Sequence, residues 1–145
     1  MKFNVPIKIL SNDAVIPTYG SEFSAGADLY SIEAYSVAPH ETVLVHTGIA
    51  IEIPDGYVGL IYARSGLATK RSLAPANKVG VVDSDYRGEV MVSLHNHSNE
   101  TQSIEAGERV AQIVFTPYVS AEFEVTDELS DTQRGKGGFG STGKK

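Results

Sequence analysis

The chain has 145 residues, the length of a single domain that buries about two thirds of its unfolded surface. Its net charge of −6 at pH 7, with basic residues scattered along the sequence, argues against a nucleic-acid partner. The lack of cysteine excludes thiolate nucleophiles, disulfide frameworks and sulfur-ligated zinc sites. Neither a signal-peptide core nor a run of 18 apolar residues is present, so we expect no membrane segment and a cytoplasmic location.

The amino-terminal part predicts one peripheral strand and a small-residue segment. Residues 3–9 alternate between apolar and other side chains, with the period of a half-buried strand, and Pro6 favours an edge position. Small residues at 24–27 allow a close approach of the backbone before Leu29 resumes the apolar pattern. Asp28 in this segment is either a turn residue or a ligand.

The next stretch predicts strands and tight reversals. Residues 42–53 are β-like and interrupted by Gly48, which indicates two strands. The Pro-Asp-Gly sequence at 54–56 is typical of a turn, and residues 57–63 form a further predicted strand.

A short helix is predicted after this strand. Ser65, followed by Gly66, has the chemistry of a helix cap for a helix through residues 67–71. Free backbone N–H groups at the helix start, next to the guanidinium of Arg64, would favour an anion such as phosphate. An ordinary capped helix with a surface arginine explains the same residues.

The central stretch, residues 76–94, predicts a β-hairpin. Branched apolar residues at 79–82 and alternating ones at 90–94 flank a polar turn. Asp83 lies where the first strand meets this turn, three residues before Tyr86. A general base beside an aromatic platform and plain turn chemistry both fit that position.

Beyond the hairpin the sequence predicts a loop and two strands. The His-x-His pattern in the polar loop 95–99 does not predict a metal site, because no third ligand follows at a familiar spacing. Residues 109–117 form a nearly continuous apolar strand that contains Gln112. Its amide must either bond neighbouring backbone or face a polar ligand. Residues 121–125 are predicted to form the last strand.

The carboxyl-terminal segment, residues 127–145, combines an acidic linker with a glycine-rich tail. Alone it is too polar and glycine-rich to fold. Phe139, surrounded by glycine and hydroxyl residues, indicates a lid that orders on an anion. Residues 138–144 partly match a phosphate-binding loop, but Lys145 stands where Ser or Thr is required, so that interpretation is rejected.

About ten short strands with turn signals every 8 to 12 residues, and at most one short helix, predict an all-β fold: a jelly-roll-like β-barrel with a flexible C-terminal tail. We expect residues 1–126 to form this barrel and residues 127–145 to form the linker and lid. The sequence shows no internal repeat and no sign of a second domain.

Five segments together resemble the trimeric dUTP diphosphatases, or dUTPases. Each is weak alone, but their order and spacing are specific, and the match spans nearly the whole chain. One departure is Ala63, where many members carry proline before Arg-Ser-Gly. The segments are residues 25–31, 63–68, 80–90, 107–114 and 134–143.

The resemblance implies hydrolysis of dUTP to dUMP and diphosphate, which keeps uracil out of DNA and supplies dUMP for thymidylate synthesis. It implies that Asp83 orients and deprotonates the water that attacks the α-phosphorus. Tyr86 would pack against deoxyribose and exclude a 2′-hydroxyl, while the backbone near Asn77 would meet the uracil edge. Thymine and cytosine would be rejected by shape and by donor pattern.

The resemblance also implies a Mg²⁺ ion carried by the phosphates, which Asp28 would meet through water, and a homotrimer with shared active sites. Arg64, Ser65, Gly66 and Gln112 would hold phosphate oxygens, and the tail would close over the nucleotide. The implied substrate-binding residues are Arg64, Ser65, Gly66, Asn77, Gly80, Val81, Val82, Tyr86, Met91, Gln112, Arg134, Phe139, Gly140, Ser141 and Thr142.

Three rival functions remain open from the sequence. A dCTP deaminase shares the fold, but its Arg-Ser-Ser segment and its glutamate context are absent here. A non-catalytic nucleotide sensor would use the same fold, and release of diphosphate separates it from an enzyme. A purely structural jelly roll would have no use for the charged glycine-rich tail.

Overall fold

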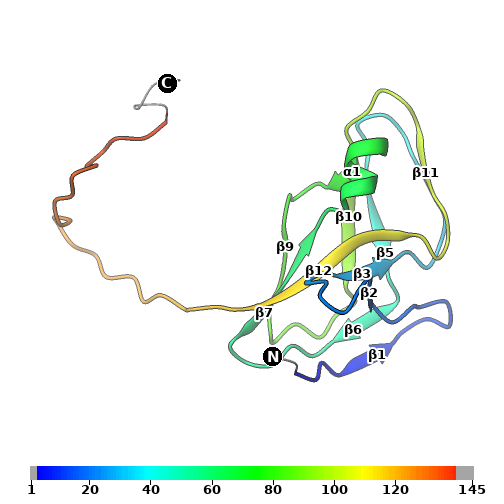
Figure 1. Ribbon diagram of the computed structural model, residues 1–145, viewed down its shortest axis with the longest axis horizontal. Coiled ribbons are helices and arrows are strands. Elements are labelled where there is room, and N and C mark those ends of the chain that lie inside the picture. Colours follow the sequence, from blue (N-terminus) through cyan, green and yellow to red (C-terminus); the bar gives the residue numbers. More distant parts are fainter. Residues whose placement is uncertain (1–2, 140–145) are drawn as a thin grey trace.

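The structure, a computed structural model, describes residues 3–139 of the chain (Figure 1). This part is all-β apart from one short helix, α1 (Ser65–Arg71), as the sequence predicts. The strands are β1 (Ile7–Ile9), β2 (Thr18–Tyr19), β3 (Ala27–Tyr30), β4 (Tyr35–Val37), β5 (Thr42–His46), β6 (Ile49–Ile51), β7 (Tyr57–Tyr62), β8 (Leu73–Pro75), β9 (Gly80–Val82), β10 (Met91–Asn96), β11 (Gln102–Ile104) and β12 (Arg109–Pro117).

Within the described residues the strands form four antiparallel sheets. The largest has the order β2-β3-β12-β7-β9, and a three-stranded sheet has the order β5-β10-β8. Two-stranded sheets, β1-β6 and β11-β4, complete the body. β12 lies at the centre of the largest sheet, where Gln112 is paired with Asp28 on one side and with Tyr62 on the other (Figure 1).

One apolar core fills the space between these sheets. Alternation along β10 buries Val92 and Leu94, and the neighbouring strand β5 contributes Val45. Valine and isoleucine suit such pleated, buried surfaces. The core residues are Ala27, Leu29, Val37, Val45, Ile49, Ile51, Ile53, Ile61, Leu67, Leu73, Val82, Val90, Val92, Leu94, Ile104, Val110, Ala111 and Ile113. No helix in residues 3–139 is long and apolar enough to span a membrane.

The predicted turns and strand break are present. Gly48 has a φ of +69° between β5 and β6, and Gly56 has a φ of +82° in the turn before β7. Both values lie in the left-handed region that glycine adopts without steric cost.

The predicted hairpin of residues 76–94 is wrong in its pairing. β9 pairs with β7 in the five-stranded sheet, while β10 pairs with β5 and β8 in another sheet. The physical reason is that a strand has only two hydrogen-bonding edges. One edge of β10 is taken by β5, and β8 takes the other edge at its end, so β9 diverges from β10. β9 and β10 are therefore not hydrogen-bonded to each other.

Two further sequence predictions need correction. Ser65 does not cap α1: the N-cap is Arg64, without a side-chain cap hydrogen bond, and Ser65 is the first helical residue. Residues 121–125 are not a strand, because β12 is the last one in the described chain and residues 118–139 belong to no sheet. Apolar alternation predicts a strand only where a sheet edge is available to receive it.

Candidate active site

The structure distributes the predicted site residues over three places: a pocket between β9 and β10, a cluster around Asp28, and the tail. The β9–β10 pocket has a volume of about 310 Å³ and is lined by residues of both strands, which belong to different sheets. Its walls include seven residues that the resemblance implied: Asn77, Gly80, Val81, Val82, Asp83, Tyr86 and Met91.

Asp83 lies directly after β9, where the chain turns away from the five-stranded sheet. The N–H of Tyr86 donates to the Asp83 carbonyl at 3.2 Å, which closes this turn. The Asp83 side chain is exposed, and within residues 3–139 its carboxylate has no hydrogen-bond or ion-pair partner. A carboxylate in that state can accept a proton from water.

The ring of Tyr86 is fixed on the other side of the same pocket. Its hydroxyl donates to the carbonyl of Glu89 at 3.0 Å, and 42% of the residue remains exposed. Gly88 makes this arrangement possible, because a Cβ at that position would lie 2.4 Å from the tyrosine hydroxyl. The ring therefore presents an ordered aromatic face to whatever enters the pocket.

The pocket also presents backbone that no strand covers. β9 is the edge strand of its sheet, and Val81 on it is 62% exposed. An edge strand carries N–H and C=O groups that lack a ladder partner. Such groups can bond a planar heterocycle through its donors and acceptors, which is the chemistry that the family resemblance implies for the backbone of this segment.

The second place is centred on Asp28 in β3, whose side chain is only 13% exposed. Its carboxylate accepts from Arg64 Nε at 2.8 Å and from Arg109 Nη1 at 3.3 Å. Two guanidinium groups face one carboxylate, so the cluster carries an excess positive charge that favours an anion. Arg109 is a residue that the sequence reasoning missed.

Gln112 lies beside this cluster and lines the same pocket, about 350 Å³ in volume, as Asp28. Its side-chain Nε2 donates to the carbonyl of Ala63 at 2.9 Å. The sequence left open whether the Gln112 amide bonds neighbouring backbone or faces a polar ligand. In the structure its nitrogen bonds backbone. The amide oxygen lies close to Gly26, where an added Cβ would be 2.3 Å away, so only glycine fits there.

Ser65 and Gly66 are exposed in the first turn of α1, next to Arg64. No heavy atom lies within 4 Å of a Cβ added at Gly66, so space is open on this side of the helix. First-turn N–H groups lack intrahelical partners and are available to a ligand.

A Mg²⁺ ion fits this cluster only through water or phosphate. The described residues contain no group of three His, Cys, Asp or Glu side chains that could hold a metal. Both oxygens of Asp28 already accept from arginines, so direct coordination would compete with two ion pairs. Mg²⁺ usually keeps several waters and combines one or two carboxylates with substrate phosphates, which matches a single carboxylate beside an anion site.

In the third place, the tail, none of the described residues 127–139 lines either pocket. Arg134 Nε donates to the Gly137 carbonyl at 2.8 Å, within the tail itself, and the Phe139 ring is fully exposed. Figure 1 shows the tail extending away from the sheets after β12. Gly140, Ser141 and Thr142 lie outside the described residues.

Besides Arg109, the sequence reasoning missed the contact between Glu89 and His46, whose side chains are hydrogen-bonded at the edge of the β9–β10 pocket. Glu89 follows the predicted turn directly, but His46 is 43 residues away in another strand. No local pattern signals such a contact, since it depends on how the sheets pack.

Comparisons with known proteins agree with this architecture. The family model for dUTPase matches residues 12–143. The deoxyuridine 5′-triphosphate nucleotidohydrolase of Nautilia profundicola is 52% identical over 138 residues, which cover 95% of this chain and 97% of that protein. The corresponding protein of Picosynechococcus is 48% identical, over 92% of this chain and 94% of the relative.

Solved structures show the same fold. The Staphylococcus bacteriophage 80alpha dUTPase with dUPNHPP superposes with a TM-score of 0.91 at 29% identity, covering 98% of this chain and 99% of that one. A variant dUTPase of S. aureus phage phi11, whose structure describes a structural Mg(II) ion, has a TM-score of 0.79 at 25% identity, over 88% and 99% of the two chains. The fold and the site define a jelly-roll-like nucleotide-binding protein. The chain belongs to the dUTPase family.

Proposed function

We propose that the protein hydrolyses dUTP to dUMP and diphosphate. The observation that carries this proposal is the β9–β10 pocket, where an unpaired carboxylate, an ordered tyrosine ring and an uncovered strand edge meet. The relatives named above as deoxyuridine 5′-triphosphate nucleotidohydrolases cover almost the whole chain and support the same substrate. This activity keeps uracil out of DNA and supplies dUMP for thymidylate synthesis.

In the proposed reaction Asp83 is the general base. Its carboxylate accepts a proton from water while the water oxygen forms a bond to the α-phosphorus. The bond from that phosphorus to the bridging oxygen breaks, and diphosphate leaves with the electron pair. A Mg²⁺ ion bound to the phosphates would neutralise their charge, with Asp28 as its water-mediated partner in the protein.

Selection of the nucleoside is assigned to the walls of the β9–β10 pocket. Backbone of Gly80, Val81 and Val82 would bond the uracil edge, with Asn77 and Met91 completing the slot. The Tyr86 ring would lie against the deoxyribose, where a 2′-hydroxyl has no room. Cytosine presents the reversed donor pattern and would leave buried polar groups unpaired, a cost of about 1–3 kcal/mol per group.

Binding of the phosphates is assigned to Arg64, Ser65, Gly66 and Gln112. In the single chain, β3 and β9 are three strand spacings apart in the five-stranded sheet, or roughly 14 Å. Asp28 and Asp83 accordingly line different pockets. A homotrimer in which each active site combines residues of different subunits would bring such separated groups to one nucleotide, and we propose that assembly.

The tail is proposed to close the site. Arg134, Phe139, Gly140, Ser141 and Thr142 would contact the base and the γ-phosphate once the nucleotide is bound. Residues 127–145 thus act as linker and lid to a body formed by residues 1–126, in a cytoplasmic enzyme. Exposed Phe139, and the absence of any strand or helix in residues 127–139, support a lid that orders late.

The test is diphosphate release from dUTP, dCTP, dTTP and UTP, each with and without Mg²⁺. We expect release from dUTP alone, and much faster with the metal. Ammonia release from dCTP would indicate a deaminase instead. Nucleotide binding without diphosphate release would indicate a sensor, and either result would reject the proposed function.

A further inference from the structure

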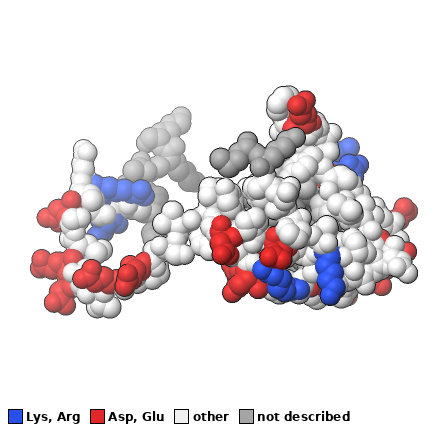
Figure 2. Space-filling model, turned by 90° about the horizontal axis from the view of Figure 1, so that it is seen from below, with Lys and Arg blue, Asp and Glu red and all other residues white. Residues whose placement is uncertain are grey.

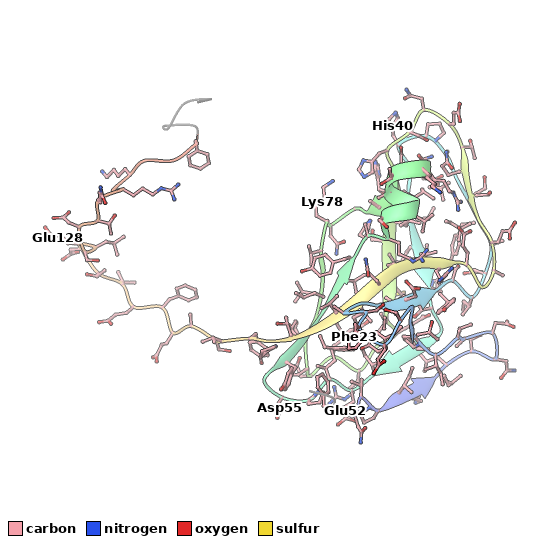
Figure 3. All side chains as sticks on the ribbon, viewed as in Figure 1. Phe23, His40, Glu52, Asp55, Lys78 and Glu128 are labelled. Carbon is pink, nitrogen blue, oxygen red and sulfur yellow. The ribbon has the colours of Figure 1, made fainter. Side chains whose placement is uncertain are left out.

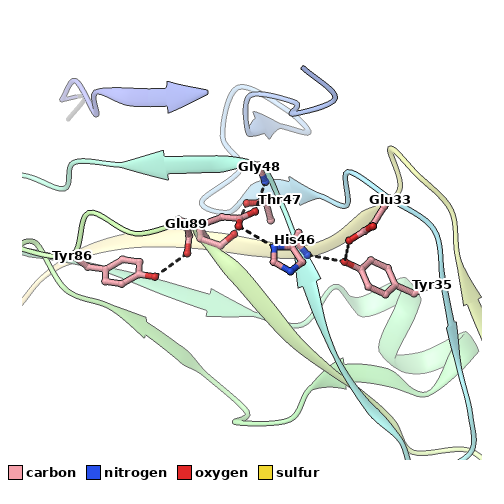
Figure 4. Close-up of polar contacts among 8 residues, drawn as sticks. Glu33, Tyr35, His46, Thr47, Gly48, Tyr86 and Glu89 are labelled. Atoms are coloured by element: carbon pink, nitrogen blue, oxygen red, sulfur yellow. Dashed lines mark hydrogen bonds and ion pairs between the residues drawn. The ribbon is translucent and has the colours of Figure 1, made fainter. Parts of the chain in front are cut away.

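The carboxylate of Glu89 bridges the loop of the candidate site to a different part of the fold (Figure 4). Its Oε2 lies 2.9 Å from His46 Nδ1 at the end of β5, and its Oε1 accepts the Gly48 N–H at 2.8 Å. Both oxygens are therefore used on the turn between β5 and β6. Since a carboxylate only accepts, Nδ1 of His46 carries the proton in this contact.

This contact keeps Glu89 ionised although its side chain is only 22% exposed. Burial alone raises the pKa of Glu89, but the hydrogen bonds from His46 and from the Gly48 N–H outweigh it and lower the pKa below its ordinary value. Charge-assisted hydrogen bonds of this kind are the stronger ones in proteins. The bridge is thus a built contact and not a mobile surface ion pair.

The main chain of the same residue holds the site tyrosine. The Glu89 carbonyl accepts the Tyr86 hydroxyl at 3.0 Å, as Figure 4 shows. The next residue, Val90, donates its N–H to the Ile49 carbonyl at 2.8 Å and accepts from the Thr47 hydroxyl. Loop 83–90 is consequently fixed at its β10 end by the β5–β6 turn, and the ring of Tyr86 is fixed with it.

The backbone of His46 is held in turn by a further hydrogen-bonded pair. Its backbone N–H donates to the Tyr35 hydroxyl at 3.1 Å, and that hydroxyl donates to Glu33 Oε1 at 2.7 Å. In the β5–β10 ladder His46 is paired with Met91, which lines the pocket. The imidazole therefore lies next to the pocket wall without being part of it.

We propose that Glu89 and His46 form a positioning pair that holds loop 83–90, and with it the Tyr86 ring, in the conformation that binds the nucleoside. The proposal rests on the function proposed above. Asp83 lies at the opposite end of the loop, directly after Val82, the last β9 residue paired with β7, so the pair acts on binding more than on the proton transfer.

The pair is tested with Glu89→Ala, His46→Ala and His46→Asn, by steady-state hydrolysis of dUTP and by calorimetric binding of dUMP. We expect both alanine variants to raise KM and the dUMP Kd about threefold to tenfold with kcat within about twofold. His46→Asn should recover most of the affinity, because its amide nitrogen can take the place of Nδ1 as donor. Should Glu89→Ala fail to fold, the two His46 variants, at a side chain that is 41% exposed, still decide the question.

The double variant His46→Ala/Glu89→Ala should bind no more weakly than Glu89→Ala, since two residues that act as a unit are not additive. Glu41→Gln is the matched control. The Glu41 carboxylate also accepts a backbone N–H, from Ala38 at 2.7 Å, but this bond lies within a single turn. It should leave KM unchanged.

Unchanged KM and Kd in the alanine variants, with only a lower melting temperature, would reduce the pair to a structural contact and overturn the proposal. A fall in kcat at constant KM would also overturn it. If wild type fails to hydrolyse dUTP, the proposed function is rejected. The dUMP affinity of the variants relative to wild type then decides whether Glu89 and His46 act as a positioning pair. Absence of both activity and dUMP binding in wild type would reject both proposals.

Discussion

The β9–β10 pocket and the tail both carry residues expected to contact the nucleotide, but in opposite physical states. Around the pocket, Val82 and Val90 are buried, and hydrogen bonds hold the loop between them. In the chain after β12, Phe123 is 95% exposed just before the linker and Phe139 is fully exposed in the tail, and Glu128 lies far from the sheets (Figure 3). The pocket is preformed, whereas the tail must obtain its contacts from a ligand or from another chain.

Energetics explain why the tail stays open in a single chain. Burying one phenylalanine contributes about 1.5–3 kcal/mol, while fixing the backbone costs roughly 1–2 kcal/mol per residue. The chain is also acidic between residues 122 and 131, as the carboxylates along it in Figure 2 show. One exposed ring cannot hold such a segment closed, so the proposed closure would need the additional bonds of a bound nucleotide.

The largest expected effect comes from removing the base in the preformed pocket. Asp83→Asn should lower kcat for dUTP on the order of a hundredfold or more, because an amide cannot accept the proton from water. Binding of dUTP should change little, since the shape of the pocket is kept. Single-turnover hydrolysis and calorimetry measure the two quantities separately.

Asp85→Asn is the matched control for this variant, as it removes the same charge two residues away in the same loop without touching the expected base. It should retain most of the activity. Near-normal turnover by Asp83→Asn would remove the catalytic assignment, whatever the control shows.

Deleting the chain from Arg134 onward tests the role of the tail. Turnover of dUTP should fall at least about tenfold, because contacts made on closure contribute to the transition state. The melting temperature should stay close to that of wild type, since the deleted residues that the structure describes bury little. Removal of Lys144 and Lys145 alone, which leaves every expected contact residue, is the control. Unfolding of the truncated body would contradict a separate lid.

The same contrast explains what the sequence could predict. Alternation and turn chemistry predict strands within residues 42–53 and at 57–63, and the turns at Gly48 and Gly56, because these features are local. The segments 25–31 and 80–90 point to Asp28 and Asp83 through their resemblance to a family. Pairing partners are not local, and for that reason β9 and β10 were wrongly joined in one hairpin.

The sequence did not predict Arg109 and His46 as contact residues for the same reason. Arg109 meets Asp28 across 81 positions, and His46 meets Glu89 across 43. Both contacts follow from sheet packing, which no window of a single sequence contains. The false strand at residues 121–125 is the converse case: its apolar pattern is real, but this chain offers it no edge within the described residues.

A smaller effect is expected where the Asp28 cluster meets the phosphates. Arg109→Gln should raise KM for dUTP about threefold to tenfold, the net scale of one lost hydrogen bond at a half-exposed side chain. The Kd of dUMP should change less, because it lacks the two outer phosphates. Lys8→Gln, which removes one positive charge from the edge strand β1, is the control and should alter neither constant. Equal losses for both ligands would place Arg109 at the nucleoside and not at the phosphates.

The smallest effect is a pH dependence of stability that belongs to the pocket and not to the tail. The pKa of Glu89 is lowered in the folded protein: burial opposes the shift, but the bonds from His46 and Gly48 prevail. The unfolded chain therefore binds the proton first as pH falls. The stabilisation is present above the ordinary pKa of a glutamate and is lost as pH falls through the lowered value.

Glu89→Gln should consequently lower the melting temperature at about pH 7 by a few degrees, and the difference from wild type should shrink towards about pH 3. Circular dichroism melts across this range measure it. Glu124→Gln in the exposed tail is the control and should follow the wild-type curve throughout. A constant offset between Glu89→Gln and wild type at every pH would mean that the glutamine disturbs packing and that ionisation of Glu89 does not hold the loop. The preformed state of the pocket would then have to come from backbone bonds such as Val90 to Ile49 alone.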